Sequence, residues 1–169
     1  MKKNKISVRE LAILSMLGAM MIVGQIVMAP LPNIEPVSLL ILCCAAVYGW
    51  KTLFPIYVFV LVEGLVFGVG MWFISYLYIW VVPLIAAILI RDYDSALLAA
   101  LVSAAFGLIF GALTSIPYLF IGGIRMMLSY IASGLIFDVL HCAGNFVLAL
   151  VLYKPLVTLI KRLNSSRTA

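Results

Sequence analysis

Long apolar runs separated by short polar stretches make up nearly the whole of this sequence. The runs predict six helices, at about residues 8–29, 37–48, 53–69, 71–90, 96–116 and 126–163. Most of these runs reach the roughly 20 residues that a helix needs to cross a bilayer, whereas the second is short for a span. The pattern therefore predicts an all-α integral membrane protein, a bundle of six transmembrane helices.

Proline and glycine mark the places where the apolar runs are interrupted. Three prolines lie between the first two runs, and Gly68 and Gly70 end the third. Pro83 predicts a kink in the fourth helix, and Pro155 predicts another near the end of the sixth. Residues 117–125, which contain two adjacent glycines, are expected to form a loop.

The composition supports a membrane protein. The chain has 169 residues, of which 66% are hydrophobic and 10% charged, and its mean hydropathy is +1.26. Soluble domains are about half apolar and a quarter charged, so we expect a single membrane domain over residues 1–169 with short basic tails at about 1–8 and 163–169. The sequence contains no nucleophile elbow, phosphate-binding glycine loop or zinc-protease pattern. The chain is therefore not expected to be an enzyme or to hydrolyse ATP by itself.

The basic residues predict the orientation in the membrane. With six spans and an inner N-terminus, Arg125 is the only basic residue on the outer side. The inner side holds Lys2, Lys3, Lys5, Arg9, Lys51, Arg91, Lys154, Lys161, Arg162 and Arg167. This distribution follows the positive-inside rule, so both termini are expected to be cytoplasmic. Topology thereby accounts for the net charge of +5, and nucleic acid is not an expected partner.

A polar stripe lies inside the last apolar run. Its members are spaced i, i+3, i+4 and i+7, which places them on one face of an α-helix: Asp138, His141, Cys142 and Asn145. Polar groups at membrane depth are costly unless they meet partners or a ligand. Asp138, His141 and Asn145 are therefore candidate contacts to a solute, and the alternative is that they only join helices.

Other side chains extend the candidate site. Glu63 is a second intramembrane carboxylate, which would contact a solute or tie two helices together. Arg125 would hold an anionic group or neutralise a carboxylate, unless it is a solvated loop residue. Trp72, Tyr76 and Trp80 would stack on a flat ring or belong to an interfacial aromatic belt.

A metal site is not expected, because the chain has one histidine and its cysteines lack the spacing of zinc ligands. Cys43, Cys44 and Cys142 lie in apolar segments, where cysteine usually acts as a small hydrophobic residue. No cofactor follows from the sequence.

Small residues recur at four-residue spacing, which lets helix backbones approach closely in lipid. The pairs are Ser15 and Ala19, Gly64 and Gly68, and Gly107 and Gly111. Such pairs usually pack within one chain, but the pair in the first helix would suit the helix of a partner protein.

Three stretches resemble the S components of energy-coupling factor (ECF) vitamin transporters. The basic start and Ser15-x-x-x-Ala19 resemble that family's small-residue motif, which usually reads Ala-x-x-x-Ala. Residues 32–37, Pro-Asn-Ile-Glu-Pro-Val, resemble the loop that caps the binding pocket. The third stretch resembles the last helix of several vitamin-binding members: Asp138-x-x-His141-x-x-Gly144-Asn145, followed by Tyr153-Lys154-Pro155-Leu156.

This resemblance implies a multi-pass protein of a bacterial cell membrane that binds a vitamin-like solute from outside with high affinity. Its partners would be a transmembrane T component, facing Ser15 and Ala19, and two cytoplasmic ATPase subunits. Asn33 and Glu35 would lie in the gating loop. The solute contacts would be Glu63, Trp72, Tyr76, Trp80, Arg125, Asp138, His141 and Asn145. The solute stays open among cobalamin, pantothenate, folate, a pyridoxine-like compound and a queuosine precursor.

Two other functions fit the same residues. A stand-alone proton-coupled transporter would use Glu63, Asp138 and His141 as a relay. A membrane scaffold or biogenesis factor would use the polar stripe only to join helices. A six-helix chain without an internal repeat is small for a complete pump, which favours a subunit of a larger assembly.

Overall fold

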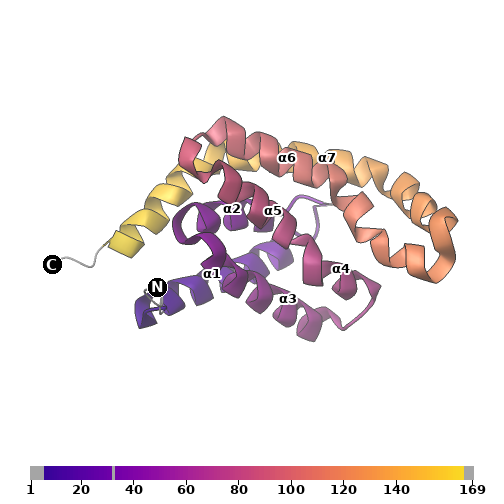
Figure 1. Cartoon of the computed structure of the whole chain (residues 1–169), viewed down its shortest axis with the longest axis horizontal. Helices are drawn as coiled ribbons and strands as arrows, with labels where there is room; N and C mark the ends of the chain where they lie inside the picture. Colours follow the sequence, from indigo (N-terminus) through magenta and orange to yellow (C-terminus); the bar gives the residue numbers. More distant parts are fainter. Residues whose placement is uncertain (1–5, 32, 166–169) are drawn as a thin grey trace.

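The computed structural model describes residues 6–31 and 33–165, and the regular secondary structure of these residues is entirely helical (Figure 1). The α-helices are α1 (Val8–Met28), α2 (Val37–Tyr48), α3 (Leu53–Phe67), α4 (Met71–Ile79), α5 (Val81–Ile90), α6 (Ala96–Thr114) and α7 (Ile116–Ser165). Two short 3-10 helices, η1 (Gly49–Thr52) and η2 (Arg91–Tyr93), connect α2 to α3 and α5 to α6. Lys2, Lys3, Lys5 and Arg167, which contribute to the predicted orientation, lie outside the described residues, as does Pro32.

Five helical stretches in the described part of the chain are long and apolar enough to cross a membrane. They are Val8–Met28, Val37–Phe67, Met71–Tyr93, Ala96–Thr114 and Ile116–Ser165. The second stretch contains both α2, with 12 residues, and α3, with 15 residues. The expectation of an all-α chain with the composition of a multi-pass membrane protein is therefore confirmed.

The predicted fourth helix is broken at Trp80 rather than at Pro83, so that α4 and α5 are separate helices. Pro83 has no N–H to donate to the carbonyl of Ile79, and its ring crowds that carbonyl. The break therefore falls at Trp80, directly after the carbonyl of Ile79 and three residues before the proline. Tyr78 donates a hydrogen bond of 2.6 Å to the carbonyl of Leu113, which fixes α4 against the end of α6.

Residues 117–125 do not form the loop that their glycines predicted, because they belong to α7. Gly123, with φ 69°, is the residue within α7 whose backbone is not helical. Glycine adopts this left-handed conformation without steric strain, so one residue is enough to redirect the chain. Tyr118 stacks on Tyr130 across this turn, with ring centroids 4.6 Å apart. Pro155 lies inside α7, and the backbone there stays helical.

Helices α6 and α7 lie side by side, as Figure 1 shows, and glycine lets their backbones approach closely. A Cβ atom at Gly107 would lie 2.8 Å from the backbone nitrogen of Cys142. A Cβ atom at Gly111 would overlap the carboxylate of Asp138. This small-residue pair therefore packs within the chain, whereas Ser15 and Ala19 are exposed on α1.

Helix α2 is the most enclosed helix of the bundle. All of its residues except Ala46 and Val47 are buried, and it packs against α1, α5 and α7. A helix that is apolar on every side belongs in a core. Cys43 and Cys44 are buried here, as expected for small hydrophobic residues. The start of α2 is consequently held inside the bundle, which positions the loop that precedes it.

The close approach of α6 and α7 makes a specific prediction. We expect Gly107→Ala to lower the free energy of unfolding by about 1–3 kcal/mol, because the added methyl group meets backbone rather than a movable side chain. Gly134→Ala is the matched control, since a Cβ atom there meets nothing within 4 Å. The control should be neutral or slightly stabilising, as alanine favours the helix. Thermal unfolding of both variants in detergent tests this, and an equal effect of the two substitutions would contradict it.

Candidate functional site

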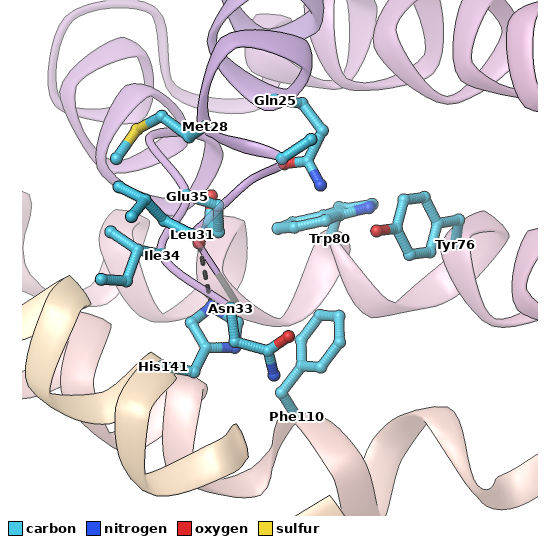
Figure 2. Close-up of a pocket in the computed structure, with 11 residues that line it drawn as sticks. Gln25, Met28, Leu31, Asn33, Ile34, Glu35, Tyr76, Trp80, Phe110 and His141 are labelled. Atoms are coloured by element: carbon cyan, nitrogen blue, oxygen red, sulfur yellow. Dashed lines mark hydrogen bonds and ion pairs between the residues drawn. The ribbon is translucent and has the colours of Figure 1, made fainter.

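A hollow of about 280 Å³ lies beside the end of α1 and the loop that follows it. We call it the central hollow. Its walls come from α1, from residues 29, 31 and 33–35, and from α4, α6 and α7, together with Trp80 at the break between α4 and α5. Gln25, Glu35 and His141 are among the polar residues that line it (Figure 2).

Two neighbouring hollows share residues with the central one and extend the site. The α3 hollow, about 260 Å³, shares Gln25 and Tyr76 and reaches Glu63. The α7 hollow, about 290 Å³, shares Phe110 with the central hollow and reaches Asp138. Carboxylates that are far apart in the sequence are therefore brought around one end of the bundle.

Glu35 is anchored by three donors. One carboxylate oxygen accepts the backbone N–H of Ser38 at 2.8 Å, and the other accepts the Ser38 hydroxyl. That second oxygen also lies 3.0 Å from Nε2 of His141. Desolvation by burial alone would raise the pKa of Glu35, but the hydrogen bonds from His141 and Ser38 outweigh it and hold the pKa below its ordinary value. The carboxylate at the start of α2 is therefore ionised, and it also faces the favourable end of the helix dipole.

Packing fixes the same loop from both sides. A Cβ atom at Gly24 in α1 would overlap the ring of Pro36, and one at Gly144 in α7 would lie 3.2 Å from Ile34. Asn33, which has a positive φ of 54°, borders both the central and the α7 hollows. Of the two residues expected in a gating loop, Glu35 is buried and anchored, whereas Asn33 is only half-buried. The loop is therefore held more firmly at Glu35 than at Asn33.

Several buried polar atoms around the hollows have no hydrogen-bond partner within the described residues. In the central hollow they are Gln25 Oε1, Trp80 Nε1 and His141 Nδ1. Figure 2 shows the Gln25 carboxamide pointing toward Trp80 from α1. Buried polar groups are nearly always satisfied in folded proteins, so unpartnered ones that surround a hollow indicate a place for a ligand or water.

Aromatic rings run in a continuous row from the α3 hollow to the polar stripe. We call it the aromatic row, and its members are Trp72, Tyr76, Trp80, Phe110 and His141. Successive ring centroids are 5.1, 5.3, 5.9 and 4.8 Å apart, which is the separation of edge-to-face or tilted pairs. The first three members are spaced by four residues, so the helical repeat brings them to one side. The row presents apolar ring surfaces to the hollows.

Glu63 and Asp138 differ in how well their carboxylates are satisfied. Asp138 is buried in α7, and its Oδ1 accepts the backbone N–H of Gly111 at 3.0 Å. Glu63 is 4% exposed in α3, and its Oε1 has no partner within the described part of the chain. Glu63 therefore has more hydrogen-bonding capacity left for a ligand.

Two candidate residues lie away from the hollows. Arg125 is exposed on α7 and does not line any of them, and the described carboxylates do not pair with it. Asn145 is buried one turn beyond His141, and its amide donates a hydrogen bond of 3.3 Å to the carbonyl of Ser103. Asn145 consequently joins α6 to α7, which is the alternative role that the sequence left open.

The site also contains residues that the sequence analysis did not select. Gln25 is a carboxamide in an apolar helix, and the rule that singled out Glu63 applies to it as well. Ser38 was hidden by its position at the start of an apolar run. Nothing in the sequence identifies Phe110 as a site residue, because aromatic residues are common in apolar helices.

Comparison with protein-family models, curated proteins and solved structures gives no match to this chain. In residues 6–31 and 33–165, no group of three histidine, cysteine, aspartate or glutamate side chains has the arrangement of a metal site. The function therefore has to be argued from the hollows and their lining.

The anchoring of Glu35 predicts a pH dependence of stability. Because the folded pKa of Glu35 lies below its ordinary value, its contribution is fully present above that value and is lost as the pH falls through the folded pKa. Glu35→Gln should lower the free energy of unfolding at pH 7 by about 1.5–3 kcal/mol, the usual contribution of hydrogen bonds to a charged group. The difference from wild type should shrink at acidic pH. Thermal unfolding between pH 7 and pH 3 measures it.

Asp92→Asn serves as the control for this experiment, since the Asp92 side chain is 88% exposed. It should leave the unfolding temperature unchanged at either pH. A constant difference between Glu35→Gln and wild type across the pH range would show that the carboxylate charge is not what stabilises this loop.

Proposed function

We propose that this chain is the membrane solute-binding subunit, or S component, of an ECF-type importer that takes up a vitamin-like micronutrient. The observation that carries the proposal is the central hollow, where Gln25, Trp80 and His141 present buried polar atoms without partners. A concave, largely aromatic site with a few convergent polar groups is the usual form of a small-molecule pocket. The chain would bind the solute, and separate ATPase subunits would supply the energy.

The proposed topology has six crossings, with α2 and α3 counted separately and both termini in the cytoplasm. Several contacts support it. Glu10 pairs with Lys51 at 2.9 Å, and Asp94 pairs with Lys154 at 3.1 Å. In this topology all four residues belong to the inner side. The start of α1 and the end of α7 also lie at the same end of the molecule in Figure 1, away from the hollows around the end of α1. The hollows would then open to the outside.

The proposed T component would dock on the exposed side of α1. Ser15 and Ala19 are exposed there, and Ala19 borders an apolar groove of about 550 Å³ between α1, α2 and the last part of α7. Small residues on a lipid-facing helix allow another helix to approach closely. A transmembrane helix of the T component fits this surface better than a soluble protein does, because the groove lining is apolar.

The rival proton relay has less support. Glu63, Asp138 and His141 are not joined by a hydrogen bond, since the described partner of Asp138 is Gly111 and that of His141 is Glu35. A relay needs a continuous path of hydrogen-bonded groups or water between its members. The scaffold function is favoured by Asn145 and Asp138, which both join α7 to the backbone of α6.

Uptake experiments separate these functions. We expect vesicles that contain the chain with its T component and ATPase subunits to accumulate the solute in an ATP-dependent manner, and vesicles with the chain alone to bind it without accumulation. Accumulation by the chain alone, driven by a pH gradient, would instead support the relay. Failure of every vitamin to raise the unfolding temperature of the purified chain, under conditions in which a known S component responds, would count against the proposal.

The docking surface gives a separate prediction. Ala19→Leu should abolish co-purification of the chain with its T component, because the larger side chain blocks close helix approach, and it should leave solute binding unchanged. Ala105→Leu is a matched control, because Ala105 is exposed on α6, away from this groove. Retention of the complex by Ala19→Leu would place the docking surface elsewhere.

A further inference from the structure

The lining of the three hollows is acidic. Each hollow contains one carboxylate: Glu35 in the central hollow, Glu63 in the α3 hollow and Asp138 in the α7 hollow. Within the described residues, no lysine or arginine lines any of them. Clefts with charges of one sign and low-dielectric walls concentrate the opposite charge.

Partners within the chain leave part of this negative charge unbalanced. Among the described lining residues, only His141 is able to carry a positive charge, and its Nε2 already contacts Glu35 at 3.0 Å. Asp138 accepts a backbone N–H, which carries no net charge, and the Oε1 of Glu63 has no partner in the described part of the chain. An ionised carboxylate in a buried site is unfavourable unless a cation or several donors reach it.

The unpartnered polar atoms of the lining also favour a ligand that donates hydrogen bonds. Gln25 Oε1 and Glu63 Oε1 are buried and have no partner within the described residues, and both belong to residues that line the α3 hollow. The carboxamide oxygen only accepts, and the Glu63 carboxylate only accepts when it is ionised. Trp80 Nε1 is an unpartnered donor, and Trp80 is 1% exposed. A ligand that offers more donors than acceptors satisfies this set.

The shape and size of the site limit the ligand further. The aromatic row supplies ring faces that favour a flat ring, and such faces attract a cation through the ring quadrupole. The hollows measure about 260–290 Å³ each, at the low end of ligand pockets. One or two small rings fit this space, and a corrinoid does not.

We infer that these hollows bind a small, flat nitrogen heterocycle that carries a positive charge or an amine and bears no carboxylate or phosphate group. This inference rests on the proposed function and adds the substrate class to it. The amine or ring cation lies near Glu63, and the ring lies against the aromatic row at Tyr76. Acidic vitamins are excluded because their charge would meet Glu63 and Asp138 without a cation to balance it.

Matched pairs of compounds test the charge preference on the full chain purified in detergent. Pyridoxamine is compared with 4-pyridoxate, and thiamine with thiamine monophosphate, by shift of the unfolding temperature and by calorimetric titration. We expect the amine or cation of at least one pair to bind at least tenfold more tightly than its acidic partner. Equal or tighter binding of the acidic member would overturn the inference.

Substitution of one carboxylate tests the mechanism. Glu63→Gln keeps the size of the side chain and should weaken binding of the preferred probe at least tenfold, without lowering the unfolding temperature of the free protein. Glu10→Gln is the matched control in the first turn of α1, about 22 Å along the helix from Gln25 at 1.5 Å per residue, and should leave the affinity within twofold. Unchanged affinity in Glu63→Gln would overturn the inference.

The outcome of the binding experiments also distinguishes failure of this inference from failure of the proposed function. Tight binding of an acidic vitamin, such as nicotinate or pantothenate, would overturn the substrate class and still support a solute-binding subunit. If no probe binds, the substrate class is overturned for rings of this size. The proposed function then depends on whether the chain co-purifies with a T component and supports ATP-dependent uptake.

Discussion

The contact between Glu35 and His141 holds the site together, because it joins the loop after α1 to the middle of α7. Both side chains are at most 7% exposed, so neither would tolerate loss of the other without leaving a buried polar group unsatisfied. Ser38 adds two more hydrogen bonds and thereby ties the carboxylate to the start of α2. The loop after α1, the start of α2 and the distant middle of α7 are therefore fixed at one point, and the central hollow lies beside it.

Two backbone constraints place the rest of the lining. Gly107 and Gly111 bring α6 against α7, so that Phe110 reaches the ring of His141. Pro83 removes a hydrogen bond from the fourth apolar run, and the resulting break lies at Trp80. Because the ring of Trp80 is held between Tyr76 and Phe110, the break lies within the aromatic row, where a ligand would pack.

Much of the fold follows from the sequence, since apolar runs and their interruptions are local signals. Helices α1 and α2 begin and end within a residue of their predicted limits. The exceptions have physical reasons. Gly123 alone redirects the chain where a loop was expected. Pro83 interrupts the helix upstream of itself, because the hydrogen bond that it cannot donate would go to the carbonyl four residues earlier. For the site, helical spacing identified Asp138 and His141 as neighbours. Gln25 and Phe110 became part of it only through contacts between helices, which spacing within one run cannot reveal.

The polar groups of this chain divide according to where their partners are. Asn145 and Asp138 bond to the backbone of α6, so they are partly or wholly used in joining helices. Glu35 is fully used in fixing the loop. Glu63, Gln25 and Trp80 are different, because each keeps an unpartnered atom at the edge of a hollow. Buried atoms without partners within the described residues also occur away from the hollows, at Tyr48, Thr52, Ser103 and Asn145. What distinguishes Glu63, Gln25 and Trp80 is that they line a hollow, where a ligand would be able to supply the missing partners.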